Sequence, residues 1–169
     1  HSIPCFGYKI TIPRSGKFSV ERAREAGIPV SCWNRLQHGE AVEHEGSLFT
    51  PDMVMGEARR GISVVYCTDT RPIPRIAEKA KDVDLFICEG MYGEEDKLSN
   101  AKKHKHMTME EAAILGREAQ PREMWLTHYS PSEVYPEQYK DKFSHIFPVK
   151  FARDAWSKDI SFEEEEEGK

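Results

Sequence analysis

Hydrophobic and polar positions follow two different patterns along this chain. In the first part, residues 5–12 alternate with a period of two, which predicts a β-strand. A short helix is predicted over residues 20–26, because a glycine follows as a stop signal. Residues 41–50 predict two short strands that turn at Glu45 and Gly46.

From residue 63 onward, apolar strands alternate with helices. Strands are predicted over residues 63–68, 84–88, 123–128 and 149–156, and helices over residues 74–81, 108–119 and 136–143. The helix at 108–119 has the clearest start, because Thr108 and Glu111 have the spacing of a capping box. Pro136 suits the first turn of the last helix. This alternation predicts an α/β fold with helices packed on a sheet.

The composition is that of a soluble globular protein. The chain has 169 residues, 38% hydrophobic and 31% charged, which is enough to bury a core. No apolar run approaches the roughly 18 residues that span a bilayer, so a cytoplasmic location without a membrane partner is predicted. Four cysteines without a CxxC pair argue against a zinc knuckle or a disulfide framework. The net charge of −5 includes a run of glutamates, so residues 161–169 are predicted to form a disordered tail.

Ionisable residues stand at the ends of three predicted core strands. Asp69 follows the sequence SVVYCT, Glu89 follows DLFIC, and His128 follows MWLT. In open α/β sheets, ligands bind beyond the carboxyl ends of the strands, where loops gather side chains from several strands. His106 stands just before the capped helix. These four residues are the candidate site.

The four residue types suit a metal-dependent hydrolysis. Asp and His together favour a zinc-like divalent ion. A carboxylate has two oxygens, so Asp69 could bridge two metal ions roughly 3.5–4 Å apart, as in enzymes that activate water against phosphodiesters. Glu89 and His106 suit a relay in which the carboxylate orients an imidazole that gives a proton to a leaving oxygen.

Each candidate also has an ordinary structural interpretation. Asp69 could close a turn at the strand end and pair with Arg71. Glu89 could be a surface carboxylate in a loop, and His106 could belong to a solvated basic cluster with the lysines around it. His128 could be a hydrogen-bonded core histidine. The joint pattern favours the site, since four such residues fall at matching places.

A basic segment precedes these strands. Its cations are Arg14, Lys17, Arg22, Arg24 and Arg35, and the aromatic residues Phe18 and Trp33 lie among them. An ordinary solvated loop explains this composition by itself. The alternative is a weak substrate-binding surface.

The chain resembles a known family in many ordered motifs. GKFSVERAREAGIP, TDTRP, CEGMYG, HMTMEEAA, LTHYSP and IFPVKFARD resemble, in this order, the C-terminal half of ribonuclease Z. That family comprises tRNA 3′-processing endoribonucleases of the metallo-β-lactamase fold. The resemblance runs from residue 1 to about residue 154 and implies half of a four-layer αββα sandwich, one sheet with its helices plus an arm-like insertion at about 14–39.

The resemblance also implies roles for the candidate residues. Asp69 is similar to the aspartate that bridges two zinc ions, with manganese or magnesium as alternatives, and His128 to a ligand of the second zinc. Glu89 and His106 are similar to the pair that acts in proton transfer. Residues 17–39 resemble the arm that grips tRNA. The implied activity is hydrolysis of precursor tRNA just after the discriminator base, and the implied assembly is a homodimer of the complete protein.

The sequence departs from the family at several positions. Cys88, Gly90 and Met91 replace three residues of the first relay motif, and Met107 replaces the middle residue of the second. Ser31 and Cys32 stand at the Gly-Pro step of the arm, and Ser132 stands where many members have arginine.

The family's His-x-His-x-Asp-His motif occurs nowhere in these residues. A catalytic zinc normally needs three protein ligands, so we expect residues 1–160 to be a half domain that is inactive without a partner N-terminal half. Two alternatives stay open: another phosphodiesterase of the metallo-β-lactamase fold, or an inactive fragment that binds RNA or another subunit.

Overall fold

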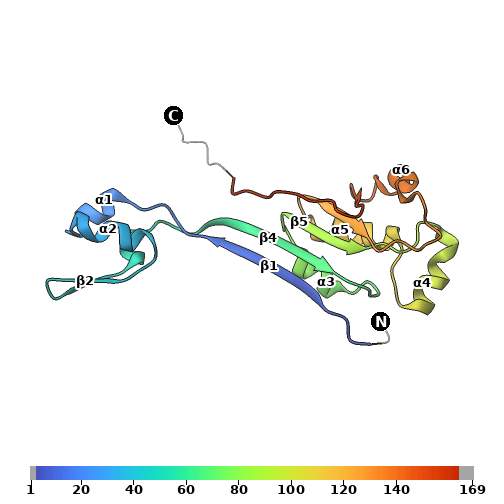
Figure 1. Ribbon diagram of the computed structural model, residues 1–169, viewed down its shortest axis with the longest axis horizontal. Coiled ribbons are helices and arrows are strands. Elements are labelled where there is room, and N and C mark those ends of the chain that lie inside the picture. Colours follow the sequence, from blue (N-terminus) through green and yellow to red (C-terminus); the bar gives the residue numbers. More distant parts are fainter. Residues whose placement is uncertain (1–2, 164–169) are drawn as a thin grey trace. The chain divides into compact units, whose positions relative to one another are not determined.

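The structure is a computed structural model, and the residues it describes are 3–163 (Figure 1). The chain forms two compact units. One comprises residues 1–12 together with residues 62–169, and the other is Pro13–Gly61. The second unit is therefore an insertion in the sequence of the first. The acidic run predicted to form a tail lies mostly outside the described residues.

A five-stranded mixed sheet forms the centre of the first unit. Its strands, in spatial order, are β1 (Gly7–Arg14), β4 (Arg59–Cys67), β5 (Leu85–Glu89), β6 (Met124–Thr127) and β7 (Lys150–Phe151). The last four are parallel neighbours, and β1 runs in the opposite direction (Figure 1). The predicted strands are confirmed, although the one expected at 149–156 is shorter. It ends early because β6, its neighbour in the sheet among the described residues, itself ends at Thr127.

Helices connect the parallel strands. They are α3 (Pro74–Ala80), α4 (Leu98–His104), α5 (Met109–Ala119) and α6 (Lys140–Phe143), with 3₁₀ turns at Glu95–Lys97 and Pro136–Tyr139. The helix predicted at 136–143 is thus divided into a 3₁₀ turn and α6. Sequence reasoning missed α4, because it buries a single residue, Ala101, and shows no apolar stripe.

The main core lies between the sheet and two of these helices. α3 and α5 pack against each other, and α5 also packs on β5 and β6. Phe86, Met124 and Leu126 point from the strands into this core and are at most 1% exposed. Small residues on α5 face them, including Ala112 and Ala113. Their size lets the helix approach the sheet closely.

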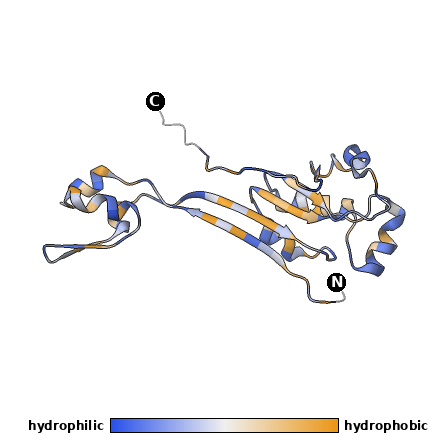
Figure 2. Cartoon of the chain, in the orientation of Figure 1, coloured by the Kyte–Doolittle hydropathy of each residue, from blue (hydrophilic) through white to orange (hydrophobic). Residues whose placement is uncertain are grey.

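The opposite face of the sheet is only partly covered. Leu85 and Trp125 form a small cluster there, and Ile160 from the C-terminal segment packs on it. Figure 2 shows hydrophobic and hydrophilic residues alternating along β1 and β4. On β1, Tyr8, Ile10 and Ile12 are each more than half exposed. The outer strand β1 therefore leaves apolar side chains exposed.

The second unit is a small helical insertion with a hairpin. It contains α1 (Val20–Glu25), α2 (Val30–Gln37), β2 (Val42–His44), β3 (Ser47–Phe49) and a 3₁₀ turn at Pro51–Met53. The predicted hairpin turn is confirmed: Glu45 and Gly46 have φ of 49° and 78°, as a two-residue turn of this hand requires. Sequence reasoning missed α2, whose buried residues are only Cys32 and Leu36.

The sequence raised two further questions, the state of the cysteines and the presence of a membrane-spanning helix. All four cysteines are free thiols, and only Cys5 is exposed. Within residues 3–163, no helix has the length and apolar character needed to cross a membrane.

Candidate metal centre

The parallel strands bring three predicted site residues to one edge of the sheet. The register pairs Cys67 of β4 with Cys88 of β5. Asp69 comes two residues after β4 ends, Glu89 is the last residue of β5, and His128 directly follows β6. Because parallel strands end at the same edge, these side chains meet there.

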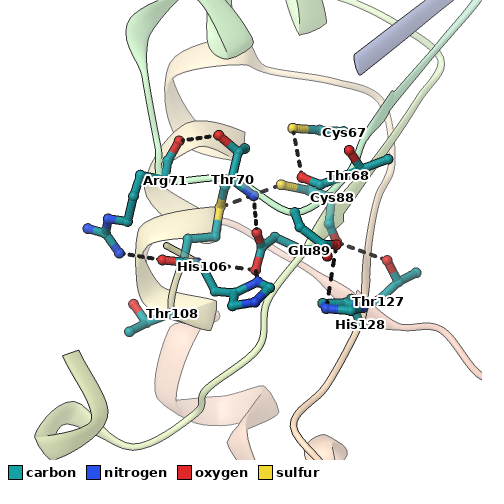
Figure 3. Close-up of polar contacts among 12 residues, drawn as sticks. Cys67, Thr68, Thr70, Arg71, Cys88, Glu89, His106, Thr108, Thr127 and His128 are labelled. Atoms are coloured by element: carbon teal, nitrogen blue, oxygen red, sulfur yellow. Dashed lines mark hydrogen bonds and ion pairs between the residues drawn. The ribbon is translucent and has the colours of Figure 1, made fainter. Parts of the chain in front are cut away.

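Asp69, His106 and His128 form a group that suits a metal ion. Figure 3 shows the two histidine rings of this group near Glu89. One ligand atom from each lies within 4.8 Å of the others. The Asp69 Oδ1 and His128 Nε2 atoms are 3.4 Å apart, and the two imidazole centroids are 5.2 Å apart. Tetrahedral zinc binds nitrogen and oxygen at about 2.0–2.2 Å, which places neighbouring ligand atoms about 3.4 Å apart. The donor set and this spacing fit zinc.

The backbone of His128 is strained. Its φ is +59°, in the left-handed region that non-glycine residues rarely adopt. Two residues further, the Ser130 N–H donates to the Met91 carbonyl at 2.9 Å, which holds the turn. Such strain persists where the surrounding structure enforces it and is common at functional sites. Here it turns the imidazole toward Asp69.

Glu89 and His106 form a buried pair behind this group. Their Oε2 and Nδ1 atoms are 3.1 Å apart, and Glu89 is 1% exposed. The backbone N–H groups of Thr70 and Met107 also donate to this carboxyl group, the latter at 3.2 Å. Three chain segments thus meet at one carboxyl group: the end of β5, the loop after β4 and the loop before α5.

Burial disfavours charge in this pair. Desolvation raises the pKa of Glu89 to about 8, although the N–H donors of Thr70 and Met107 oppose the rise. Desolvation also lowers the pKa of His106. Both shifts favour the uncharged forms, in which the protonated carboxyl group donates to Nδ1 and the single ring proton is on Nε2.

The start of α5 positions His106. Thr108 and Glu111 form the predicted capping box, with the Glu111 N–H donating to the Thr108 hydroxyl at 3.1 Å. The preceding loop is joined to the end of β5, since the Met91 N–H donates to the Met107 carbonyl at 3.0 Å. His106 is 7% exposed as a result.

The ordinary interpretations of these four residues do not hold. Arg71 pairs with Glu111 rather than with Asp69. Glu89 and His106 are buried, so neither belongs to a solvated surface. The His128 side chain is 43% exposed and is not a core histidine. The structure thus brings all four candidates together.

Sequence reasoning missed the residues that support this group. Arg71 and Glu111 form an ion pair beside His106, and Thr70 donates to Glu89. The only sequence signals for these contacts were the arginine in TDTRP and the capping glutamate.

The five predicted substrate-binding cations are not part of this group. They belong to the second unit or to the end of β1 that enters it. The Arg22 guanidinium donates to the Met55 carbonyl at 3.0 Å, and Arg35 pairs with Glu40 at 2.9 Å. At least two of the cations therefore have structural contacts.

Curated relatives are similar over nearly the whole chain. Ribonuclease Z of Lachnospira eligens is 56% identical over 166 residues, which is 98% of this chain and 55% of the relative. Ribonuclease Z of Agathobacter rectalis is 51% identical with the same coverage. The chain spans about half the length of the curated relatives it matches.

Solved structures and a family model also match. A human short-form tRNase Z structure has a TM-score of 0.47 at 19% identity, covering 69% of this chain and 38% of that one. A metallo-beta-lactamase fold protein of Bacillus subtilis has a TM-score of 0.47 at 26% identity, covering 54% and 37%. The model of the beta-lactamase superfamily domain matches residues 20–129, well over half of the chain. This chain therefore belongs to the beta-lactamase superfamily.

Proposed function

We propose that this chain supplies the C-terminal part of a zinc-dependent endoribonuclease that removes the 3′ trailer of precursor tRNA. The observation that carries the proposal is the convergence of Asp69, Glu89, His106 and His128 at one sheet edge. The names of the relatives support the choice of reaction, because they are ribonucleases Z at up to 56% identity.

Each residue has a distinct part in the proposed reaction. Asp69 and His128 would hold the metal, and zinc bound there would act as a Lewis acid. Glu89 orients the His106 ring through Nδ1, across 3.1 Å. As water attacks the phosphorus and the bond to the 3′-oxygen of the discriminator nucleotide breaks, the Nε2 proton passes to that oxygen. The Glu89 carboxyl proton passes to Nδ1, so that His106 stays uncharged and Glu89 becomes a carboxylate.

A cavity beside His128 is the proposed place for the RNA end. Its volume is about 620 Å³, and His128, Tyr135 and Arg153 contribute to its lining. Tyr135 is 72% exposed, so its ring is available for stacking on a base. Arg153 is paired with Glu137 but is 69% exposed on its side chain and can turn toward a phosphate. The cations of the second unit are proposed to contact tRNA elsewhere.

The remaining metal ligands are proposed to come from an N-terminal half. With His106 assigned to proton transfer, Asp69 and His128 are two ligands, and a catalytic zinc takes three. The exposed apolar residues Tyr8, Ile10 and Ile12 of β1 are the proposed docking edge. The completed protein is proposed to be a homodimer.

Reconstitution tests this proposal. The chain is mixed with the N-terminal part of the Lachnospira eligens relative, zinc and a precursor tRNA with a 3′ trailer, and co-elution on gel filtration verifies assembly. We expect a single cut after the discriminator base. His106→Ala should lower the rate by about 10²–10⁴-fold, and His104→Ala, which changes an exposed histidine of α4, should not.

Two outcomes of this experiment would overturn the proposal. An assembled, zinc-loaded protein that binds precursor tRNA without cutting it would be an RNA-binding fragment. Cleavage of a small chromogenic phosphodiester without cleavage of precursor tRNA would indicate another phosphodiesterase of the same superfamily.

A further inference from the structure

Three successive residues contact three different parts of the candidate centre. Asp69 faces His128 at 3.4 Å. The backbone N–H of Thr70 donates to the Glu89 carboxyl group. The Arg71 guanidinium donates through Nη1 to the backbone carbonyl of His106 at 2.6 Å. One short loop after β4 therefore contacts the metal group and both members of the buried pair.

Arg71 is itself held in place by Glu111. Its Nη1 donates to Glu111 Oε2 at 2.8 Å, and its Nη2 contacts Oε1. Glu111 Oε2 also accepts the N–H of Thr108 at 3.0 Å, as part of the capping box of α5. The side chains of Arg71 and Glu111 are 27% and 19% exposed. Because this ion pair is partly buried and bidentate, it is more rigid than a pair on the surface.

Arg71 joins the loop that bears His106 to the loop that bears Asp69. The His106 carbonyl group lies in the loop between α4 and α5. The Arg71 guanidinium hydrogen-bonds it and so connects this loop to the loop after β4, which bears Asp69. Lysine has a single ammonium group at this position and cannot bond the His106 carbonyl and both Glu111 oxygens in the planar geometry that arginine offers.

We propose that Arg71, held by Glu111, is a positioning residue that sets the His106 imidazole relative to Asp69 and His128. It acts through the backbone of His106 and does not touch the reacting atoms. Its effect on the His106 ring stands on geometry alone, and its effect on cleavage rests on the proposed function.

The first test is a spectroscopic readout on the chain itself. The imidazole ¹⁵N signals of His106 and His128 are recorded by NMR and assigned with His106→Gln and His128→Gln. In Arg71→Gln and Glu111→Gln, the His106 signals should shift and broaden while the backbone spectrum keeps its dispersion. Glutamine at 111 retains the capping box, so this variant removes the ion pair without removing the helix start. Arg71→Lys should give an intermediate result.

Arg122→Gln is the matched control. Arg122 also pairs with carboxylates, those of Glu163 and Asp84, but it lies before β6, at the other end of the sheet. It should leave the His106 signals unchanged. Unchanged His106 signals in folded Glu111→Gln and Arg71→Lys would overturn the proposal, even if Arg71→Gln failed to fold.

The second test uses the reconstituted enzyme. Arg71→Gln should lower kcat by about 10- to 100-fold, the cost of a small misplacement of a catalytic group, with KM for precursor tRNA nearly unchanged. An equal loss in Arg122→Gln, or a change confined to KM, would contradict a positioning role. If the unmodified assembly does not cut RNA, the proposed function fails, whereas the NMR result still decides the role of Arg71.

Discussion

One carboxylate, Glu123, ties the C-terminal segment to the start of β6, and its charge can be removed selectively. Glu123 accepts hydrogen bonds from Lys158 at 2.5 Å and from the Trp125 indole at 2.5 Å, and it pairs with Lys150 at 3.0 Å. Burial alone raises the pKa of Glu123, but these partners outweigh burial and lower it to about 2. Glu123→Gln keeps the shape and the indole contact while removing the charge.

The size of the effect follows from the pKa difference. The carboxyl pKa falls from 4.5 to about 2 on folding, and one pKa unit is worth about 1.4 kcal/mol, so the upper limit is about 3 kcal/mol. Lys158 and Lys150 are 34% and 57% exposed, and solvent screening reduces the value to about 2 kcal/mol. Because the folded-state pKa is depressed, this stability is present above pH 4.5 and is lost between pH 4.5 and about 2.

Urea unfolding followed by circular dichroism measures this difference. The free energies of unfolding of the unmodified chain and of Glu123→Gln are compared at pH 7 and pH 3, at one protein concentration. We expect a difference of about 2 kcal/mol at pH 7 that mostly disappears at pH 3. Glu137→Gln removes an exposed partner of Arg153 and should change little at either pH. A Glu123→Gln difference that is the same at both pH values would refute the reasoning.

Other perturbations test packing, metal binding and association. A Cβ at Gly93 would lie 2.1 Å from the Tyr139 ring, so Gly93→Ala should lower the free energy of unfolding by about 1–3 kcal/mol, measured by thermal unfolding. Gly56→Ala, whose Cβ has room, is the control. Equal melting temperatures for the two variants would contradict the close contact between Gly93 and Tyr139. Asp69→Asn should weaken zinc binding measured by calorimetry, because it removes the anionic ligand, and an unchanged affinity would place the metal elsewhere. The chain should elute from gel filtration above its 19.4 kDa monomer mass, and Ile10→Lys should shift it toward the monomer; a monomer before substitution would argue against an open docking edge.

Periodicity was sufficient where an element carries its own signals. The capped helix α5 and the hairpin at Glu45 and Gly46 were predicted correctly, because their caps and turn residues act over three or four positions. The helices α2 and α4 were missed because few of their residues are buried. Their stability comes from tertiary contacts, which leave little trace in local sequence.

The sequence by itself determined which residues form the candidate centre. Asp69, Glu89 and His128 could be selected because each ends an apolar strand, and the direction of parallel strands places such ends together. Only the tertiary structure decided how they interact: that Glu89 is buried against His106, that the His128 backbone is strained, and that Arg71 turns away from Asp69 toward Glu111. The physical reason is the sequence distance over which each interaction acts. Strand ends follow from neighbouring residues, whereas burial, desolvation and pairing depend on segments as distant in sequence as Asp69 and His128, which meet only in the folded chain.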